Sequence, residues 1–449
     1  METVNRLESE VRSYCRSFPK VFDRAKGAVL RDEEGGGYLD FLSGAGTLNY
    51  GHNNDEIKGA VLAYLEEDGI LHGLDLATVA KRRFLQTFER LILKPRNLKY
   101  KVQFTGPTGT NAVEAALKIA RNVKERTNIV SFTNGFHGMT LGSVSATGNS
   151  YYRDAAGVPL SLTTFMPYDG YLGDEVDTLE YLRKMLEDPS SGMDLPAAVI
   201  VETVQGEGGV NVASPRWLRG LQKICREFDI LLIVDDIQVG CGRTGPFFSF
   251  EFADLDPDVV CLSKALSGYG LPMSVVLMKP ELDIWKPGEH TGTFRGNNLA
   301  FVSAAKTLET YWSDDRFSKA VLAKSVVLKK RLKAIAEKYP EAVDVRGRGL
   351  IQGIECSPAE GAVAVSRAAF ERGLIVETSG SENQVVKCLS ALTIDEDSME
   401  TALEILERSF AAVFGDEAAL AAEEAREAEG ESPRDRIDAL VRDLVGAYE

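Results

Sequence analysis

The feature that most constrains the fold of this chain is a set of five short apolar runs between residues 101 and 262. Each run is separated from the next by a longer stretch with helical spacing. The runs are KVQF at 101, NIVSF at 128, AAVIVET at 197, ILLIVDD at 230 and DVVCL at 258. Continuous rather than alternating apolar strands are typical of a parallel sheet that is covered by helices on both faces. The pattern therefore predicts an α/β protein.

The rest of the chain predicts a second, smaller unit. We expect an N-terminal segment at 1–54 to belong to it, with a hairpin in GAVLRDEEGGGYLDFL. The large domain is expected at 55–305, and mixed strands and helices at 306–414 complete the smaller α+β domain. Residues 415–449 are an acidic Ala/Glu-rich tail with helical spacing, for which we expect an exposed helix or an oligomer contact.

Charge and composition narrow the class of protein. The formal net charge is −16 over 449 residues, which argues against nucleic acid and against an anionic membrane surface as partners. The 6 cysteines stand singly, which favours reduced thiols in the cytoplasm. The 4 histidines lie far apart, so we expect no metal site. A charged N-terminus and the lack of any long apolar run predict neither a signal peptide nor a membrane helix.

Three of the predicted strands end in an ionisable residue. AAVIV is followed by Glu202, ILLIV by Asp235, and DVVCLS by Lys264. Because function collects at the carboxyl ends of parallel strands, we expect these groups to converge on one edge of the sheet. Taken singly, an aspartate after a strand often caps a turn, and a lysine is usually a surface residue. The coincidence of all three indicates a site.

Pyridoxal phosphate uses such a set of groups directly. It forms a Schiff base with a lysine, needs a carboxylate beside its ring nitrogen and needs an anion site for its phosphate. The candidate anion site is FTGPTGTNAVEAALKIAR at 104–121, where a strand leads through Gly109 and Thr110 into a helix. An ordinary helix N-cap would have the same pattern. Phe136 and His137, in a loop after another strand, could stack on a planar cofactor or pack in the core.

A second glycine-rich motif offers a competing interpretation. GCGRTG, with Gly240, Gly242 and Gly245, satisfies the GxGxxG pattern of dinucleotide-binding proteins and follows a strand. Such a site requires the glycines to open directly onto a helix. Here DDIQV separates the strand from the motif, and GPFFSFEFAD follows with a proline and crowded aromatics. The dinucleotide interpretation is therefore disfavoured.

Taken together, the motifs resemble those of the class III (ω-amino acid) pyridoxal-phosphate aminotransferases of fold type I. The likeness covers residues 20 to 414 and rests on GTNAVEAALKIAR, FHG, VETVQGEGG, IVDDIQVGCGRTG, SKALSGYGLPMS and HTGTFRGNN. Within that family the chain is most similar to the diaminobutyrate–2-oxoglutarate transaminases of ectoine biosynthesis, on SGAGTLNYGHNN, GPTGTNAVEAA, DDIQVGCGRTG and GEHTGTFRGNN. The resemblance implies a large domain with a mostly parallel sheet and a small α+β domain formed by the N- and C-terminal segments.

The resemblance also implies roles for the residues near the strand ends. Lys264 would form the Schiff base and move the proton between the substrate carbon and the cofactor. Asp235 would pair with the pyridinium nitrogen of the cofactor. Gln238 would lie near the ring hydroxyl, and Ile237 would cover one ring face. Glu202 would lie behind the residues that contact the cofactor and would influence it through them.

Residues from other segments complete the implied cofactor site. Phe136, with His137 beside it, would cover the other ring face. Gly109 and Thr110 would hold the phosphate, and Thr293 would reach that phosphate from the neighbouring subunit. A homodimer with shared active sites would then be the smallest active unit.

At the substrate end, the resemblance assigns Glu207, Lys387 and Ala45. Glu207 aligns with a glutamate that pairs with an arginine when an ω-amine binds and releases it for a substrate α-carboxylate. Lys387, in VVKCLSALTI, stands where that arginine is expected and acts as a point charge rather than a bidentate fork. Ala45 lies in SGAGTLNYGHNN. The family's acidic pair is more often Asp-Glu, whereas Asp235 is followed here by Asp236.

The implied function is a ping-pong transamination. L-Glutamate would donate its amino group and L-aspartate 4-semialdehyde would accept it, giving 2-oxoglutarate and L-2,4-diaminobutyrate. Alternatives on the same fold are another ω-amine (ornithine, 4-aminobutyrate or β-alanine), diaminobutyrate supply for siderophores or polyamines, and a mutase or decarboxylase. A non-catalytic pyridoxal-binding regulator is a distant alternative, because neither end has a basic helix-turn-helix pattern and Lys264 is present.

Overall fold

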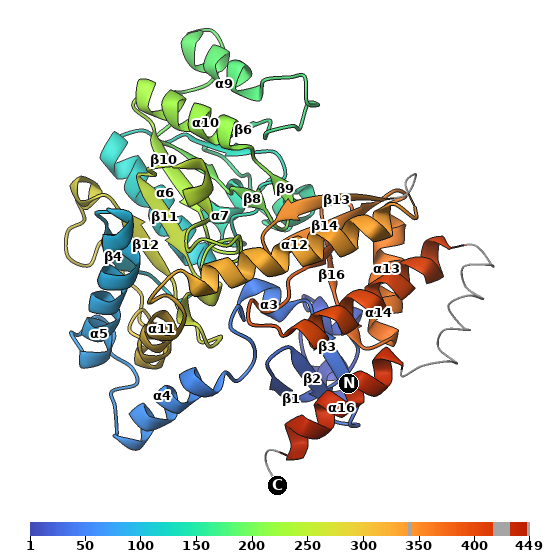
Figure 1. The fold of residues 1–449 in the computed structure, drawn as a ribbon. Helices are drawn as coiled ribbons and strands as arrows, with labels where there is room; N and C mark the ends of the chain where they lie inside the picture. The colour runs from blue at the N-terminus through green and yellow to red at the C-terminus, as the bar shows by residue number, and fades with distance from the viewer. Residues whose placement is uncertain (340–342, 416–431, 447–449) are drawn as a thin grey trace.

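A seven-stranded sheet forms the centre of the protein (Figure 1), in a computed structural model that describes residues 1–339, 343–415 and 432–446. In spatial order its strands are β4 (Lys101–Phe104), β12 (Val275–Met278), β11 (Val259–Leu262), β10 (Leu231–Asp235), β7 (Ala198–Val201), β5 (Ile129–Phe132) and β6 (Thr163–Met166). β12 runs antiparallel to both neighbours, and the other six strands point the same way. All five predicted apolar runs are strands of this sheet, and the predicted α/β class is confirmed.

Successive side chains of a strand point to opposite faces of the sheet, and both faces of this sheet are covered. On one face, α6 (Gly109–Lys124) packs against β10, β11 and β12, and its alanines share a core with Ile233 and Cys261. On the other face, Leu232, Leu262 and Leu277 belong to a larger core. The other helices of this part of the chain are α4 (Asp55–Glu66), α5 (Val79–Phe88), α7 (Leu141–Ser145), α8 (Ser150–Asp154), α9 (Thr178–Glu187), α10 (Pro215–Glu227) and α11 (Asn298–Tyr311).

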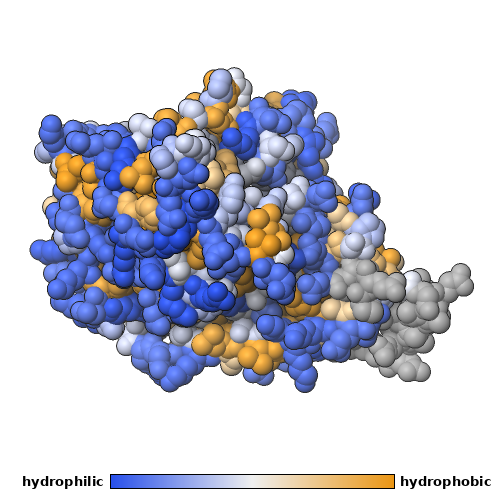
Figure 2. Space-filling view, turned by 90° about the horizontal axis from the view of Figure 1, so that it is seen from above, coloured by the Kyte–Doolittle hydropathy of each residue, from blue (hydrophilic) through white to orange (hydrophobic). Residues whose placement is uncertain are grey.

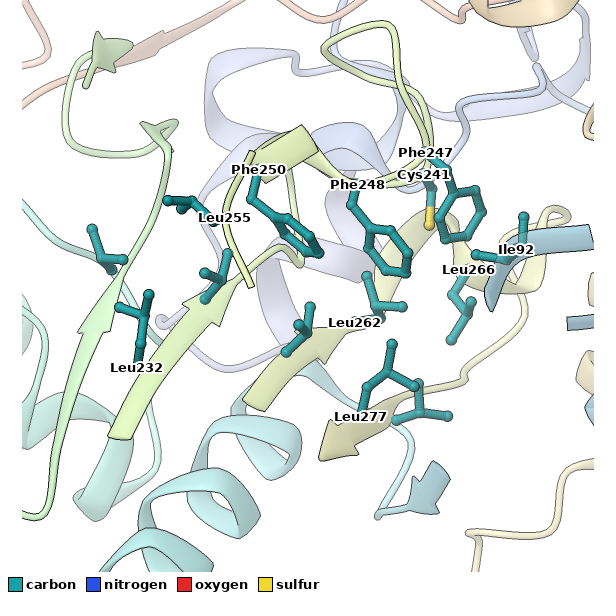
Figure 3. Packing of buried hydrophobic residues seen from close by; sticks show 14 of the residues in the cluster. Ile92, Leu232, Cys241, Phe247, Phe248, Phe250, Leu255, Leu262, Leu266 and Leu277 are labelled. Carbon is teal, nitrogen blue, oxygen red and sulfur yellow. The ribbon is translucent and has the colours of Figure 1, made fainter. Parts of the chain in front are cut away.

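The GCGRTG segment leads into this larger core rather than into a helix. Phe248 and Phe250 follow it and point toward the strands that carry Leu262 and Leu277 (Figure 3). The next helical segment is the five-residue 3-10 turn Ser249–Ala253. The glycines therefore shape the entry to an aromatic cover of the sheet, which agrees with the rejection of a dinucleotide site.

The N- and C-terminal segments share a second core. Its elements are β1 (Phe22–Lys26), β2 (Val29–Asp32), β3 (Gly37–Asp40) and β15 (Leu374–Ile375) in one sheet, β13 (Val343–Arg348), β14 (Ile351–Cys356), β17 (Val385–Cys388) and β16 (Glu377–Ser379) in another, and helices α12 (Arg316–Ala336), α13 (Glu360–Glu371) and α14 (Glu396–Phe414). The expected hairpin is β2–β3, and β15 pairs with β3 in parallel. Leu39 and Phe41 lie in one buried cluster with Val365 and Leu406. This agrees with a small unit built from both ends of the chain, while the domain limits themselves stay a prediction.

Three short helices and a small hairpin also belong to the described chain. They are α1 (Glu2–Leu7), α2 (Tyr14–Ser17), α3 (Ser43–Gly46) and the strands β8 (Val204–Gln205) and β9 (Asn211–Val212). Within the ranges that the structure describes, no helix is long and apolar enough to cross a membrane. The face in Figure 2 is mostly hydrophilic, with several separate hydrophobic patches.

The end of the chain differs from the expectation of an exposed helix. Helix α16 (Pro433–Gly446) buries Ile437 and Val441 against the N-terminal hairpin. A Cβ at Gly37 would lie 2.5 Å from Val441 Cγ2, so the absence of a side chain at this position lets the helix approach. Arg434 donates to the carbonyl of Gly37 at 3.0 Å. The expected exposed helix is therefore packed against its own chain, and the acidic stretch 416–431 lies outside the described residues.

Candidate active site

The three strand-end groups lie at one edge of the central sheet. β7, β10 and β11 are adjacent and parallel, so Glu202, Asp235 and Lys264 leave the sheet on the same side. Lys264 begins the tight turn Lys264–Ser267 with a φ of 46°. A left-handed backbone is uncommon for a non-glycine residue and collects at functional sites. The convergence expected from the sequence is thus present in the fold.

The Lys264 side chain points back across this edge. Its Nζ donates to the carbonyl of Ala45 at 2.9 Å. Ala45 itself has a φ of 54°, in the turn α3, so this carbonyl is held by a strained backbone. Burial lowers the pKa of Lys264, and the ammonium group of Lys387 adds to the effect. A lysine with a lowered pKa is a good proton acceptor near neutral pH.

Asp235 is enclosed and firmly held. Its Oδ2 lies 2.7 Å from His137 Nδ1, and its Oδ1 accepts from the backbone N–H of Ile237 at 3.2 Å. Both side chains of the pair are buried. Burial opposes a charged imidazole, but the hydrogen bond and charge of Asp235 raise the pKa of His137 above its usual value. His137, expected beside Phe136 at the ring face, instead uses its ring nitrogen to fix the aspartate.

Glu202 supports the loop that carries Phe136. Its Oε2 accepts from the backbone N–H of Phe136 at 3.0 Å. Burial raises the pKa of Glu202 to about 8, and the nearby charge of Asp235 contributes. The Phe136 ring is half-buried and lies 5.4 Å from the ring of Tyr152, edge to face. Tyr152 was not anticipated from the sequence.

Substitution of Glu202 tests this buried environment. The pKa of Glu202 rises from its ordinary value of 4.5 to about 8 on folding, so between these pH values the folded state keeps a proton that the unfolded state releases. Stability therefore falls as pH rises across this window. We expect Glu202→Gln, which keeps an acceptor for Phe136, to remove that fall, on the order of a few kcal/mol. Thermal unfolding measured across the window checks the prediction, with the exposed Glu382→Gln as control. Curves that stay parallel to wild type for both variants would contradict it.

The N-terminus of α6 provides an anion site near these groups. The N-cap residue Thr108 makes no side-chain capping bond, so the first amides of the helix are left without a side-chain acceptor. A Cβ at Gly109 would lie 3.1 Å from Ile237 Cδ1, so the absence of a side chain lets the two segments approach closely. Thr110 Oγ1 lies 2.7 Å from Thr140 Oγ1. Gly109, Thr110 and Ile237 are thus brought together as expected.

A chain of hydrogen bonds links Lys264 to the residues expected at the substrate end. The Ala45 carbonyl also accepts from Gln238 Nε2 at 3.1 Å, and Gln238 Nε2 donates to Glu207 Oε1 at 2.8 Å. Glu207 Oε1 in turn accepts from Lys387 Nζ at 2.9 Å. Burial opposes ionisation of Glu207, but Lys387 and Lys264 lower its pKa to about 2.

Two residues at this end were missed from the sequence. Lys387 Nζ also lies 3.1 Å from Glu377 Oε1, and Tyr14 donates its hydroxyl to Glu377 Oε2 at 3.0 Å. Glu377 faces Lys387 across the β16–β17 pairing. Burial raises the pKa of Glu377, although Lys387 opposes this, and the two carboxylates raise the pKa of Lys387 despite its burial. A lysine within the apolar run VVKCL requires a buried anion, and this requirement could have pointed to Glu377.

Thr293 is the expected site residue that this chain does not bring to its own site. It is exposed, in a loop whose next residue, Phe294, is 65% exposed and touches His72 edge to face at 5.4 Å. Among the described residues, no hydrogen bond joins Thr293 to Gly109 or Thr110, although a Cβ at the neighbouring Gly292 would lie 3.4 Å from Gly106 N. Its position on the surface is compatible with action on a second subunit.

A lysine after one strand, an aspartate at the end of the next and a helix N-terminus beside them define a pyridoxal-phosphate enzyme of fold type I. The family model of the class III aminotransferases matches residues 13–410, and the chain belongs to this family. It is 61% identical over 419 residues to the diaminobutyrate–2-oxoglutarate transaminase of Bordetella parapertussis, which covers 93% of this chain and 96% of that protein. It is 57% identical over 417 residues to the enzyme of the same name from Halomonas elongata, with 92% and 99% covered.

A solved structure of the same fold is that of the ornithine aminotransferase from Toxoplasma gondii, which has PLP at partial occupancy in its active site. The TM-score is 0.79 at 27% sequence identity, and 92% of this chain and 94% of the other are covered. The resemblance derived from the motifs is therefore confirmed. The protein is an aminotransferase, and its cofactor is pyridoxal phosphate.

The residues at the sheet edge fit this cofactor. Lys264 has the lowered pKa that a carbonyl-binding amine needs, and Asp235 presents a carboxylate that is held by two donors. Gln238 Oε1 is buried and has no donor within the part of the chain that the structure describes. Such an acceptor is costly unless a donor, such as a ring hydroxyl, arrives. The amides at the start of α6, which have no side-chain cap, would hold the phosphate.

Proposed function

We propose that the protein transfers the amino group of L-glutamate to L-aspartate 4-semialdehyde, giving L-2,4-diaminobutyrate and 2-oxoglutarate for ectoine biosynthesis. The shared name of the relatives at 57 and 61% identity supports the substrates. The observation that carries the proposal is the Glu207–Lys387 pair at 2.9 Å. This paired arrangement is the one expected for an ω-amine, because it keeps the cation away from the substrate's carbon chain.

The reaction needs proton transfer at the carbon that carries the amino group. When bound, pyridoxal phosphate supplies an electron sink for the electrons that this carbon keeps when its proton leaves. Lys264 would accept that proton from the substrate carbon and return it on the cofactor's side. It suits this role because burial lowers its pKa. Asp235, fixed by His137 and the Ile237 amide, holds a proton on the ring nitrogen.

The same site must accept two kinds of substrate in turn. Glu207 pairs with Lys387 for the ω-amine and turns away for glutamate, so that the ammonium group can meet a carboxylate. As a point charge, Lys387 orients that carboxylate less strictly than an arginine would. Phe136 and Ile237 would cover the two faces of the cofactor ring and exclude water from the reacting carbon.

The proposal includes a homodimer in the cytoplasm in which Thr293 of each subunit reaches the phosphate of the other. The exposed Thr293 and the apolar Leu71, Leu74 and Phe294, each at least 41% exposed, support a contact surface there. Light scattering would test it, with a mass of twice 49.0 kDa as the expected result and a monomeric active enzyme as the opposing one.

A substrate comparison tests the reaction. The enzyme, loaded with pyridoxal phosphate, is given 2-oxoglutarate and one of four amines: L-2,4-diaminobutyrate, ornithine, 4-aminobutyrate or β-alanine. We expect glutamate formation with the highest kcat/KM for diaminobutyrate. No glutamate from diaminobutyrate, together with rapid turnover of ornithine, would refute the substrate assignment and leave the family unchanged.

A further inference from the structure

We propose that Glu207, Glu377 and Lys387 form a cluster of net charge −1 that recognises the α-ammonium group of the ω-amino substrate, with Glu377 setting this charge. The inference rests on the proposed function and names the feature of the substrate that the far end of the site selects. Glu377 acts through its two neighbours and is a positioning residue. Glu207 is the member that meets the substrate.

The charge of the cluster follows from its contacts. Lys387 Nζ lies 2.9 Å from Glu207 Oε1 and 3.1 Å from Glu377 Oε1, so one ammonium group faces two carboxylates. The second oxygen of Glu377 accepts from Tyr14 at 3.0 Å, which satisfies a carboxylate without neutralising it. The other amine near Glu207 is Lys264, which the cofactor occupies. One negative charge is left in excess.

The accessible edge of the cluster is a carboxylate. The side chain of Lys387 is 0% exposed and that of Glu377 is 5% exposed, whereas that of Glu207 is 22% exposed. Glu207 Oε1 takes both hydrogen bonds, from Lys387 and Gln238, and no group of the described residues donates to its Oε2. An incoming substrate therefore meets an anionic oxygen before it meets the lysine.

This oxygen lies in the same site as the reacting lysine. Glu207 is joined to Lys264 through Gln238 and the Ala45 carbonyl. Three hydrogen bonds of 2.8 to 3.1 Å separate Lys264 Nζ from Glu207 Oε1, which leaves room between them for a short ω-amino acid only, with its reacting nitrogen at Lys264 and its other end at Glu207. L-2,4-Diaminobutyrate carries an ammonium group at that end, and L-aspartate 4-semialdehyde does also.

A matched pair of substrates isolates this contact. 4-Aminobutyrate has the same chain, carboxylate and reacting amine as L-2,4-diaminobutyrate and lacks only the α-ammonium group. An excess negative charge in the site lowers the energy of bound L-2,4-diaminobutyrate relative to bound 4-aminobutyrate. The ratio of kcat/KM for diaminobutyrate to kcat/KM for 4-aminobutyrate thus measures recognition of the α-ammonium group. A change that merely loosened the fold would alter both kcat/KM values together.

The experiment compares this ratio in wild type, Glu377→Gln and Glu382→Gln. Glu382 is exposed in the loop between β16 and β17 and controls for loss of a carboxylate in the same hairpin. We expect Glu377→Gln to lower the ratio about tenfold, mainly through KM for diaminobutyrate, and Glu382→Gln to leave it unchanged. An unchanged ratio in folded Glu377→Gln would overturn the inference.

Two further results distinguish failure of the inference from failure of the proposed function. If Glu377→Gln does not fold, Glu207→Gln decides in the same assay, since the inference requires the ratio to fall there too and an unchanged ratio would overturn it. If wild type does not accept diaminobutyrate at all, the proposed function fails and the inference fails with it. If wild type accepts diaminobutyrate and neither substitution changes the ratio, the inference is refuted and the proposed function stands.

Discussion

Replacement of Lys264 with alanine is expected to lower kcat for amino transfer by roughly 10⁴-fold, since it removes both the amine that binds the cofactor and the base that moves the proton. The side chain has no neighbour that could substitute for it in this position. Lys387, the other amine near the site, is enclosed and paired with two carboxylates. Asp235 and Glu207 are carboxylates and cannot form an imine.

The measurement is single-turnover transfer from L-glutamate, followed by the visible absorption of the cofactor. Lys286→Ala, an exposed lysine elsewhere in the chain, serves as the control and should retain the wild-type rate. Addition of a small primary amine should restore part of the activity of Lys264→Ala, because a free amine can act as the missing base. Turnover of Lys264→Ala at the wild-type rate would refute the assigned mechanism.

The second large effect is expected at Arg243, in the motif that imitates a dinucleotide site. Arg243 is fully buried and donates to the carbonyls of Leu350 and Ser390 and to Asn49 Oδ1, at 2.6 to 2.9 Å. Its guanidinium group therefore connects three distant segments of the chain. Burial lowers the pKa of Arg243 to about 9, and the carboxylate of Asp40 opposes this.

Arg243→Met keeps much of the volume and leaves three buried acceptors without a donor. We expect it to lower the free energy of unfolding by about 3 to 5 kcal/mol, as for other buried charged groups that lose a partner. Arg216→Met, whose side chain is 91% exposed, should change the free energy by less than about 0.5 kcal/mol. Urea unfolding followed by tryptophan fluorescence compares the two. Equal effects at both positions would show that Arg243 does not join the segments energetically.

Much of the large sheet could be predicted because its central strands β7, β10 and β11 are buried along their whole length and so consist almost entirely of continuous apolar residues. β6 was not anticipated, since TTFM at the edge of the sheet carries two threonines and lacks that pattern. β12 was not anticipated either, because VVLM directly follows a glycine- and proline-rich turn, and periodicity alone does not reveal its antiparallel direction.

The candidate site also contains residues that could be predicted from the sequence and residues that could not. Glu202, Asp235 and Lys264 were predictable because neighbouring parallel strands deliver their ends to one edge. Tyr14 and Glu377 were not, since their contact joins residues 363 positions apart and depends on how helix α2 lies against strand β16. Register across the β16–β17 hairpin sets Glu377 opposite Lys387, and the five-residue loop 380–384 has no two-residue turn signal that would fix this register from the sequence.

The parallel pairing of β3 with β15 has a consequence for synthesis on the ribosome. The N-terminal hairpin emerges first, yet its sheet neighbour β15 and its covering helix α16 follow more than 300 residues later. At about 5 to 20 residues per second, the nascent chain waits roughly 20 to 70 seconds for them. During that interval the apolar side chains of Leu39 and Phe41 lack the cover that the C-terminal segments later provide, so the hairpin exposes an apolar surface to which a chaperone can bind.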